Sequence, residues 1–470
     1  YPRIGEVPFT SERKRMSTIH RTPEGEIHVY IKGAPEIVLE KCDFIWDKGG
    51  PRPMTDEDRA RILKVNEEMA SQALRNLAIA YKVLKEPLEK YDESLEEGGF
   101  TFLGIMGMID PPRDEVREAI KVCENAGIKT VMVTGDHKLT AMAIAKELGM
   151  DVKRVLTGAE LDKIMDEELE KIVEDVTVYA RVSPEHKVKI LKALKKKGYR
   201  VAMTGDGVND APALKKADIG VAMGITGTDV SKEASDMILT DDNFATIVAA
   251  VEEGRRIVDN IKKYLVYLMQ CNIAEILIMV VAFMLGLPLP LTPAQILWVN
   301  LSTDGLPAIA LGVDPAEPDV MKRPPKDPQE VIFSRSVKLY LTLVPIAITA
   351  LWALVYIRFF RTLSYPVAMS TLFLTVILTE LAVAISCHSL EKPLAAAGPF
   401  TNKFLWAAVL SQVVITVPLF YVPSIARAFR VVPLGLDSWL WAIGVALIVF
   451  TGLELAKTLA FTIRMRRGQQ

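Results

Sequence analysis

Six long apolar segments in the second half of the chain constrain its fold more than any other feature. Each is close to the roughly 20 residues that a helix needs to cross the hydrocarbon core of a bilayer. They fall near residues 262–285, 291–312, 337–358, 367–387, 403–422 and 438–461. Residues 1 to about 255 are instead charged and alternate between polar and apolar positions. We therefore expect a soluble part followed by an all-α bundle of six transmembrane helices.

The basic residues around these segments predict which side of the membrane the soluble part occupies. They precede the first span, lie between the second and third, and follow the last: Arg255, Arg256, Lys262, Lys263, Lys322, Arg323, Arg464, Arg466 and Arg467. Positive residues are retained on the cytoplasmic side, and an even number of spans returns the chain to that side. We expect a multi-pass protein of the cell (plasma) membrane whose soluble domains are cytosolic.

Composition excludes several other classes of protein. The net charge of -2 gives no basic excess for holding nucleic acid. The four cysteines are widely spaced without a C-x-x-C pair, so neither a disulfide framework nor a zinc site is expected. The chain opens on Tyr1 with no signal-peptide pattern, and we expect it to begin inside a domain.

Between residues 100 and 240, short apolar runs alternate with amphipathic segments. The runs FTFLGIMGM, KTVMV, VTVYARV, YRVAM and ADIGVAM predict buried strands, and residues 114–126, 139–149, 185–197 and 244–260 predict helices. This alternation indicates an α/β domain with a parallel, Rossmann-like sheet, in which ligands bind at the carboxyl ends of the strands. Residues 1 to about 95 form a separate mixed α+β unit.

Polar residues stand at the ends of two predicted strands. Thr134, Gly135 and Asp136 follow KTVMV, and the segment TGDGVNDAP, with Asp206, Asn209 and Asp210, follows YRVAM. Two carboxylates four residues apart in a glycine-containing loop suit Mg²⁺, which prefers oxygen ligands and accompanies phosphate. The alternative is an Asp-rich turn whose groups satisfy one another. For nine such residues in this position, we favour the magnesium site.

Three acids inside the apolar segments predict a second site. Glu275, Asp304 and Glu380 each cost roughly 2.5–3.5 kcal/mol at the centre of a membrane helix. Asn272 shares a helix face with Glu275, and Asn300 and Thr303 share one with Asp304. This all-oxygen set suits Ca²⁺ better than copper or zinc.

Two neighbours of these acids carry further expectations. Pro307 removes a backbone hydrogen bond and can free carbonyl oxygens near Asp304. Cys271, next to Asn272, is expected to point about 100° away and to serve packing.

Four motifs together give the chain a family resemblance. TGDGVNDAP, the TGD at Thr134–Asp136, DPPR at 110–113 and KGAPE at 32–36 resemble P-type ATPases, most closely the type IIA calcium pumps. The resemblance covers essentially the whole chain. It implies a partial nucleotide-binding domain at 1–98, a haloacid-dehalogenase-like phosphorylation domain at 99–255 and a transmembrane domain at 256–470.

The same resemblance implies roles for individual residues. Asp206 would bind Mg²⁺ beside Asn209 and Asp210, Thr134, Gly135 and Asp136 would hold the phosphoryl group, and Lys187 would neutralise its charge. The nucleotide contacts for ATP would be Phe9, Lys14, Lys32, Arg75 and Arg181. The transported cation, Ca²⁺, would be held by Asn272, Glu275, Asn300, Thr303, Asp304 and Glu380.

Two family motifs are absent from these 470 residues, and this leaves alternatives open. Neither DKTGT, which carries the phosphorylated aspartate, nor the actuator loop TGE occurs. We expect an ATP-driven calcium exporter whose N-terminal portion is missing here, so that the fragment alone does not turn over. The alternatives are a sodium or manganese pump on the same scaffold, a non-catalytic membrane binding or regulatory protein derived from a pump, and a membrane-tethered phosphatase.

Overall fold

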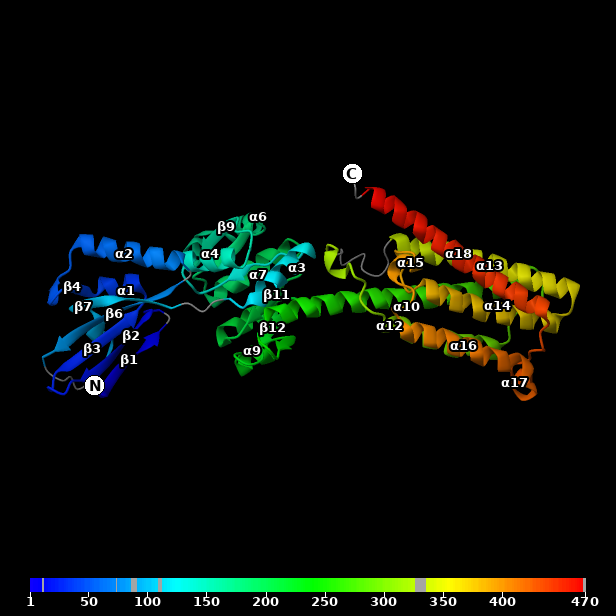
Figure 1. Ribbon diagram of the computed structural model, residues 1–470, viewed down its shortest axis with the longest axis horizontal. Helices are drawn as coiled ribbons and strands as arrows, with labels where there is room; N and C mark the ends of the chain where they lie inside the picture. Colours follow the sequence, from blue (N-terminus) through cyan, green and yellow to red (C-terminus); the bar gives the residue numbers. More distant parts are fainter. Residues whose placement is uncertain (11, 73, 86–90, 109–111, 326–334, 468–470) are drawn as a thin grey trace. The chain divides into compact units, whose positions relative to one another are not determined.

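The computed structural model describes residues 1–10, 12–72, 74–85, 91–108, 112–325 and 335–467 (Figure 1). Asp110 and Pro111 of the DPPR motif lie outside these residues. The chain divides into two compact units, Tyr1–Val248 and Ala249–Gln470. We describe each unit by itself.

A seven-stranded sheet with the order β1-β2-β3-β6-β7-β4-β5 forms the first part of the soluble unit. Its strands are β1 Arg3–Thr10, β2 Arg15–Arg21, β3 Ile27–Gly33, β4 Cys42–Asp47, β5 Gly50–Pro53, β6 Arg75–Leu84 and β7 Phe100–Met108. Alternate residues of β3, such as Val29 and Ile31, are buried. Helices α1 (Pro35–Glu40) and α2 (Asp56–Ser71) accompany the sheet. The Thr55 hydroxyl caps α2 by accepting from the Asp58 N–H.

Strand β7 does not lie where the sequence predicted it. The run FTFLGIMGM was expected to join the parallel sheet, but it pairs antiparallel with β6 and parallel with β4. A short apolar run predicts a strand without naming its partner, because its periodicity is the same in either sheet. The first sheet therefore extends past residue 98, where we expected a domain boundary.

The rest of the soluble unit has the predicted parallel strands, but they form two sheets rather than one. Among the described residues, the orders are β8-β10-β9 and β11-β12-β13, and every pairing is parallel. The strands are β8 Met132–Val133, β9 Arg154–Thr157, β10 Val176–Ala180, β11 Ala202–Gly205, β12 Ile219–Met223 and β13 Met237–Leu239. The helices are α3 Asp114–Asn125, α4 Lys138–Glu147, α5 Gly158–Lys163, α6 Asp166–Ile172, α7 Pro184–Lys196, α8 Ala211–Lys216 and α9 Asp229–Glu233.

Five helices in the described residues are long and apolar enough to cross a membrane. They are α10 Phe244–Met284, α13 Arg335–Thr362, α14 Tyr365–Ser386, α16 Lys403–Tyr421 and α18 Leu436–Arg467. Helix α10 joins the helix predicted at 244–260 to the first predicted span without a break. Helix α14 is buried along most of its length and packs against α13, α16 and α18 (Figure 1).

The second predicted span, 291–312, is helical but interrupted, so five of the six predicted spans are single long helices among the described residues. It consists of α11 (Pro293–Trp298), a π-helical turn (Val299–Thr303) and α12 (Gly305–Gly312). The Asp304 N–H donates to the Val299 carbonyl at 2.9 Å, across five residues instead of four. Pro307 has no N–H, so the regular bond to the Thr303 carbonyl cannot form. Such π-turns are frequent at functional sites.

Candidate functional site

A cavity of about 530 Å³ in the soluble unit, which we call the soluble cavity, gathers loops from both of its parts. Seven of the predicted site residues line it: Phe9, Lys14, Arg75, Gly135, Asp136, Arg181 and Asn209. They come from positions as distant as β1 and the loop after β11. Lys32 was also predicted here, but its side chain is exposed on β3 and does not belong to the lining.

Backbone geometry marks two of the lining residues. Lys14 and Arg181 have φ values of 52° and 51°, in the left-handed region that residues other than glycine seldom occupy. The Lys14 N–H closes a turn on the Thr10 carbonyl at 2.8 Å, and the Arg181 N–H donates to the Asp136 carbonyl at 3.0 Å. Such outliers cluster at ligand-binding sites. Both residues are predicted nucleotide contacts.

The loop after β8 is held by its own side chains. The Thr134 hydroxyl donates to Asp136 Oδ2 at 2.8 Å, and the Asp136 N–H donates back to that hydroxyl at 3.1 Å. At Gly135 a Cβ atom would meet nothing within 4 Å. Packing therefore does not require this glycine, whose missing side chain leaves the backbone open to a ligand in the cavity.

Asp210 is locked in place at the end of β11. Its Oδ2 accepts from the N–H groups of Asp206 and Gly207 at 3.2 Å each, and its Oδ1 accepts from Lys187 Nζ. A Cβ atom on Gly205 would lie 2.5 Å from that of Asp210, so only glycine fits there. Lys187 is thus a partner of the loop and not one of the surface lysines of its helix.

Asp206 is held by its backbone and not by its side chain. Its carbonyl accepts from the Thr228 N–H at 2.9 Å and from the Ser231 hydroxyl at 3.1 Å. Within the described part of the chain, its carboxylate has no hydrogen-bond partner. A fixed backbone with a free carboxylate fits a Mg²⁺ ligand.

Sequence reasoning missed an ion pair at the soluble cavity, between Glu36 and Arg181. Burial alone would raise the pKa of Glu36, but hydrogen bonds from a backbone N–H and from Arg181 hold it below its ordinary value of 4.5. Burial, reinforced by Arg181, lowers the pKa of the neighbouring His137. The available signal was the motif KGAPE, in which we had weighed only the lysine.

In the membrane unit, four predicted ligands present buried oxygen atoms that have no described hydrogen-bond partner. These atoms are Glu275 Oε1, Thr303 Oγ1, Asp304 Oδ2 and both carboxylate oxygens of Glu380. We call these four residues the acid cluster. Each is at most 5% exposed.

The acid cluster receives only neutral donors from the other described residues around it. The Tyr267 hydroxyl donates to Asp304 Oδ1 at 2.7 Å, and Asn300 donates to Glu275 Oε2 at 2.9 Å. Asn272 donates to the Leu268 carbonyl of its own helix at 2.8 Å, and no described contact links it to the acids. Buried acceptors without donors fit a cation with oxygen ligands.

Cys271 packs in the hydrophobic core of the membrane unit, as expected, and its sulfur also lies beside the acid cluster. One ligand atom each from Cys271, Asp304 and Glu380 lie within 4.8 Å of one another. On a helix with 3.6 residues per turn, Cys271 is about 40° from Glu275, whereas Asn272 is about 60° from it. We had compared the direction of Cys271 with that of Asn272 alone, and so we missed that Cys271 lies closer than Asn272 to the direction of Glu275.

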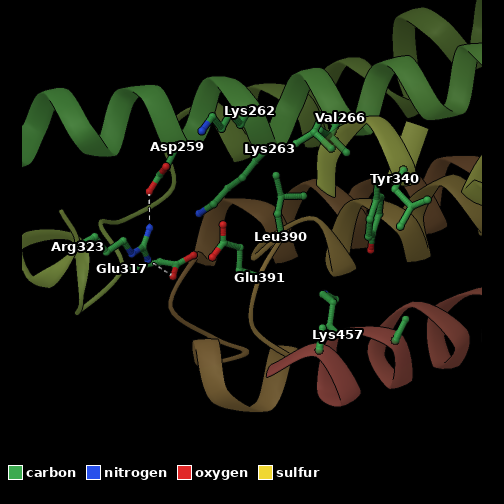
Figure 2. A pocket seen from close by; sticks show the side chains of 14 residues that line it. Asp259, Lys262, Lys263, Val266, Glu317, Arg323, Tyr340, Leu390, Glu391 and Lys457 are labelled. Carbon is green, nitrogen blue, oxygen red and sulfur yellow. Dashed lines mark hydrogen bonds and ion pairs between the residues drawn. The ribbon is translucent and has the colours of Figure 1, made fainter. Parts of the chain in front are cut away.

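A second cavity, of about 240 Å³, lies within the membrane unit beside Asp259, Lys262, Lys263 and Val266 of α10 (Figure 2). Arg323 donates there to Asp259 at 2.8 Å and to Glu317 at 2.6 Å, which ties the segment after α12 to α10. None of the predicted site residues lines this cavity.

Known protein families match three stretches of the chain. The families are described as "P-type ATPase, cytoplasmic domain N" (residues 1–115), "haloacid dehalogenase-like hydrolase" (185–251) and "Cation transporting ATPase, C-terminus" (288–459). These matches confirm the predicted fold class, a haloacid-dehalogenase-like domain followed by a helical membrane region. The first match runs past residue 108, in keeping with the place of β7 in the first sheet.

Curated relatives are similar over almost the whole chain. A calcium-transporting ATPase of Bacillus subtilis is 46% identical over 95% of this chain and 51% of its own length. Those of Bacillus cereus and Listeria monocytogenes are each 44% identical over 97% of the chain and over 53% and 52% of their own lengths. The chain spans about half the length of these relatives.

Proposed function

The chain belongs to the P-type cation-transporting ATPases, and on that premise we propose that the protein moves Ca²⁺ across a membrane, driven by ATP through an aspartyl-phosphate intermediate. This proposal rests on the unpartnered buried oxygens of the acid cluster. Placing such oxygens in a membrane costs free energy, and a bound cation would offset that cost. The relatives are named calcium-transporting ATPases, which favours calcium over sodium or manganese.

In the soluble unit, we assign each residue a part in phosphoryl transfer, which depends on positioning and on stabilising charge. Asp206 would hold Mg²⁺, which neutralises phosphoryl oxygens when bound. Lys187 places a positive charge beside Asp210. In the Thr134–Asp136 loop, the N–H groups of Thr134 and Asp136 already have acceptors, so the Gly135 N–H is the one we assign to phosphate. Phe9 presents an exposed aromatic face to a base, with Lys14, Arg75 and Arg181 nearby for the phosphates of ATP.

Two features of the intact machine are also proposals. We assign the acceptor aspartate to the part of the relatives that this chain does not match, since no DKTGT motif occurs in its 470 residues. We place the soluble unit in the cytosol and the spans in the plasma membrane. The basic residues of α10 that precede the first predicted span, such as Arg255 and Arg256, support that orientation.

The test is ATP-driven uptake of radioactive Ca²⁺ into inside-out vesicles carrying the protein expressed from its own gene. Asp304→Asn should abolish the calcium dependence of phosphorylation from ATP. Asp206→Asn should lower uptake at least about 100-fold, because a metal ion contributes several kcal/mol to the transition state. Asp151→Asn is the control, since Asp151 is exposed and outside the soluble cavity. Unchanged calcium dependence in Asp304→Asn would contradict the assignment.

A further inference from the structure

The sulfur atom of Cys271 lies among carboxylates in the membrane unit. Cys271 is 1% exposed on α10, Asp304 follows the π-helical turn, and Glu380 lies on α14. Their three ligand atoms lie within 4.8 Å of one another. Ligands on opposite sides of one metal ion, each about 2.3–2.6 Å from it, are about 4.6–5.2 Å apart. The three side chains are thus close enough to share a single ion.

The carboxylates supply an independent reason to expect a ligand here. Both oxygens of Glu380 and Oδ2 of Asp304 are buried and lack a hydrogen-bond partner within the described ranges. Each residue is 1% exposed, so bulk solvent does not reach these oxygens. A packing role for Cys271 would explain its burial but not these unpartnered oxygens.

We propose that Cys271, Asp304 and Glu380 form a mixed sulfur and oxygen site for a thiophilic divalent cation, of which Cd²⁺ is the probe. Ca²⁺ is hard and gains little from sulfur, whereas a softer ion gains a strong bond. On binding, the S–H bond breaks, the proton leaves to solvent and a metal–sulfur bond forms, with no change of oxidation state. The inference deepens the proposed function, because it rests on the same acids that would carry calcium.

The chain offers a matched control for this cysteine. Cys387 is also 1% exposed in the membrane unit, but its sulfur accepts from Gln270 Nε2 at 3.3 Å and does not belong to the group with Asp304 and Glu380. Cys387→Ser therefore changes a buried thiol in the same bundle without touching the proposed site.

The experiment titrates the purified 470-residue chain in detergent with CdCl₂ and follows the ultraviolet sulfur-to-cadmium charge-transfer absorption. Wild type and Cys387→Ser should develop this absorption with one Cd²⁺ per chain. Cys271→Ser should lose it and bind Cd²⁺ at least about tenfold more weakly, while its Ca²⁺ affinity changes less than about threefold. Glu380→Gln should also weaken Cd²⁺ binding about tenfold and yet keep the absorption at saturation.

Several results would overturn the inference. They are absorption that persists in Cys271→Ser, absorption lost instead in Cys387→Ser, or Cd²⁺ affinity unaffected by Glu380→Gln. The Glu380→Gln result is informative even if Cys271→Ser does not fold. No absorption in wild-type chains that bind Ca²⁺ would overturn this inference alone. Absorption in the 470-residue chain, together with no ATP-driven Ca²⁺ uptake by the protein expressed from its own gene, would overturn the proposed transport function alone.

Discussion

The soluble cavity and the acid cluster both contain carboxylates, but the two regions treat them in opposite ways. In the soluble unit, Asp210 accepts from Lys187 and two backbone N–H groups, and Glu36 pairs with Arg181. Asp206, the predicted Mg²⁺ ligand, is the exception, since its carboxylate has no described partner. In the acid cluster, no ion pair joins Glu275, Asp304 or Glu380 to a basic side chain among the described residues.

This difference follows from what each region would bind. A phosphate is an anion, so a site for it can keep its acids neutralised and present cations and N–H groups. A cation needs oxygen atoms that nothing else occupies, and in a membrane such oxygens are costly until the ion arrives. The four predictions below test this contrast.

The largest effect is expected where a satisfied carboxylate is removed. Asp210→Asn breaks the pair with Lys187 and leaves a half-buried ammonium group without its partner, which should destabilise the soluble unit by about 3 kcal/mol. Urea unfolding, monitored through amide hydrogen exchange in β11 and α7, measures this loss of stability. The exposed Asp151→Asn should stay within about 0.5 kcal/mol of wild type. A change of that small size in Asp210→Asn would contradict the contrast.

The opposite sign is expected at an unsatisfied carboxylate. Glu380→Gln removes an acid without a described partner and gives its amide a chance to donate to Asp304 Oδ2. Without added cation, the variant should gain about 2 kcal/mol of stability while losing Ca²⁺ binding. Thermal unfolding in chelator and in Ca²⁺ measures both effects.

Glu454 provides the matched control for this experiment. It lies in the same unit but is paired with Lys457 and accepts from Ser386 and from the Leu394 N–H. Glu454→Gln should therefore destabilise the protein. If both glutamates responded with the same sign, partnered and unpartnered acids in the membrane unit would not differ as we describe.

The sequence predicted those parts of both regions that depend on local pattern. Polar residues after predicted strands located the loops at Thr134 and Asp206, because ligand-binding loops follow the carboxyl ends of parallel strands, as they do here after β8 and β11 in their separate sheets. The acids in apolar segments located the cluster, because membrane burial makes them rare. Lys187 is one of several lysines on its helix, and only the family resemblance indicated that it belongs to the site.

The features that sequence could not predict depend on contacts distant along the chain or on local departures from regular geometry. Glu36 and Arg181 are 145 residues apart, and neither position alone indicates the pair. Hydropathy averages over a window, so it did not register the π-helical turn inside 291–312. The partner of β7 likewise depends on β6 and β4, not on its own residues.

A smaller effect is expected from restoring a regular helix beside the acid cluster. Pro307→Ala supplies an N–H that can bond to the Thr303 carbonyl and so occupies an oxygen beside Thr303 and Asp304. Affinity for Ca²⁺ should fall about tenfold, which is about 1.4 kcal/mol. Equilibrium binding of radioactive Ca²⁺ to the solubilised chain measures it. Pro345→Ala, inside α13, is the matched control and should bind as wild type. Equal Ca²⁺ affinity in the two variants would show that the π-helical turn does not contribute to ion binding.

The smallest effect concerns the ion pair at the mouth of the soluble cavity. Its side chains are 31% and 37% exposed, so Arg181→Ala should cost less than about 1 kcal/mol at neutral pH. Because the folded-state pKa of Glu36 lies below 4.5, its contribution is present above 4.5 and is lost as pH falls through the folded value. Stability curves of wild type and variant should therefore converge in acid. Lys153→Ala, which breaks an exposed pair elsewhere, should show no such convergence. If the wild type remained more stable than Arg181→Ala below the folded pKa of Glu36, Arg181 would stabilise the protein through packing and not through charge. Asp210 would then be the one charge-paired acid left to support the contrast between the two regions.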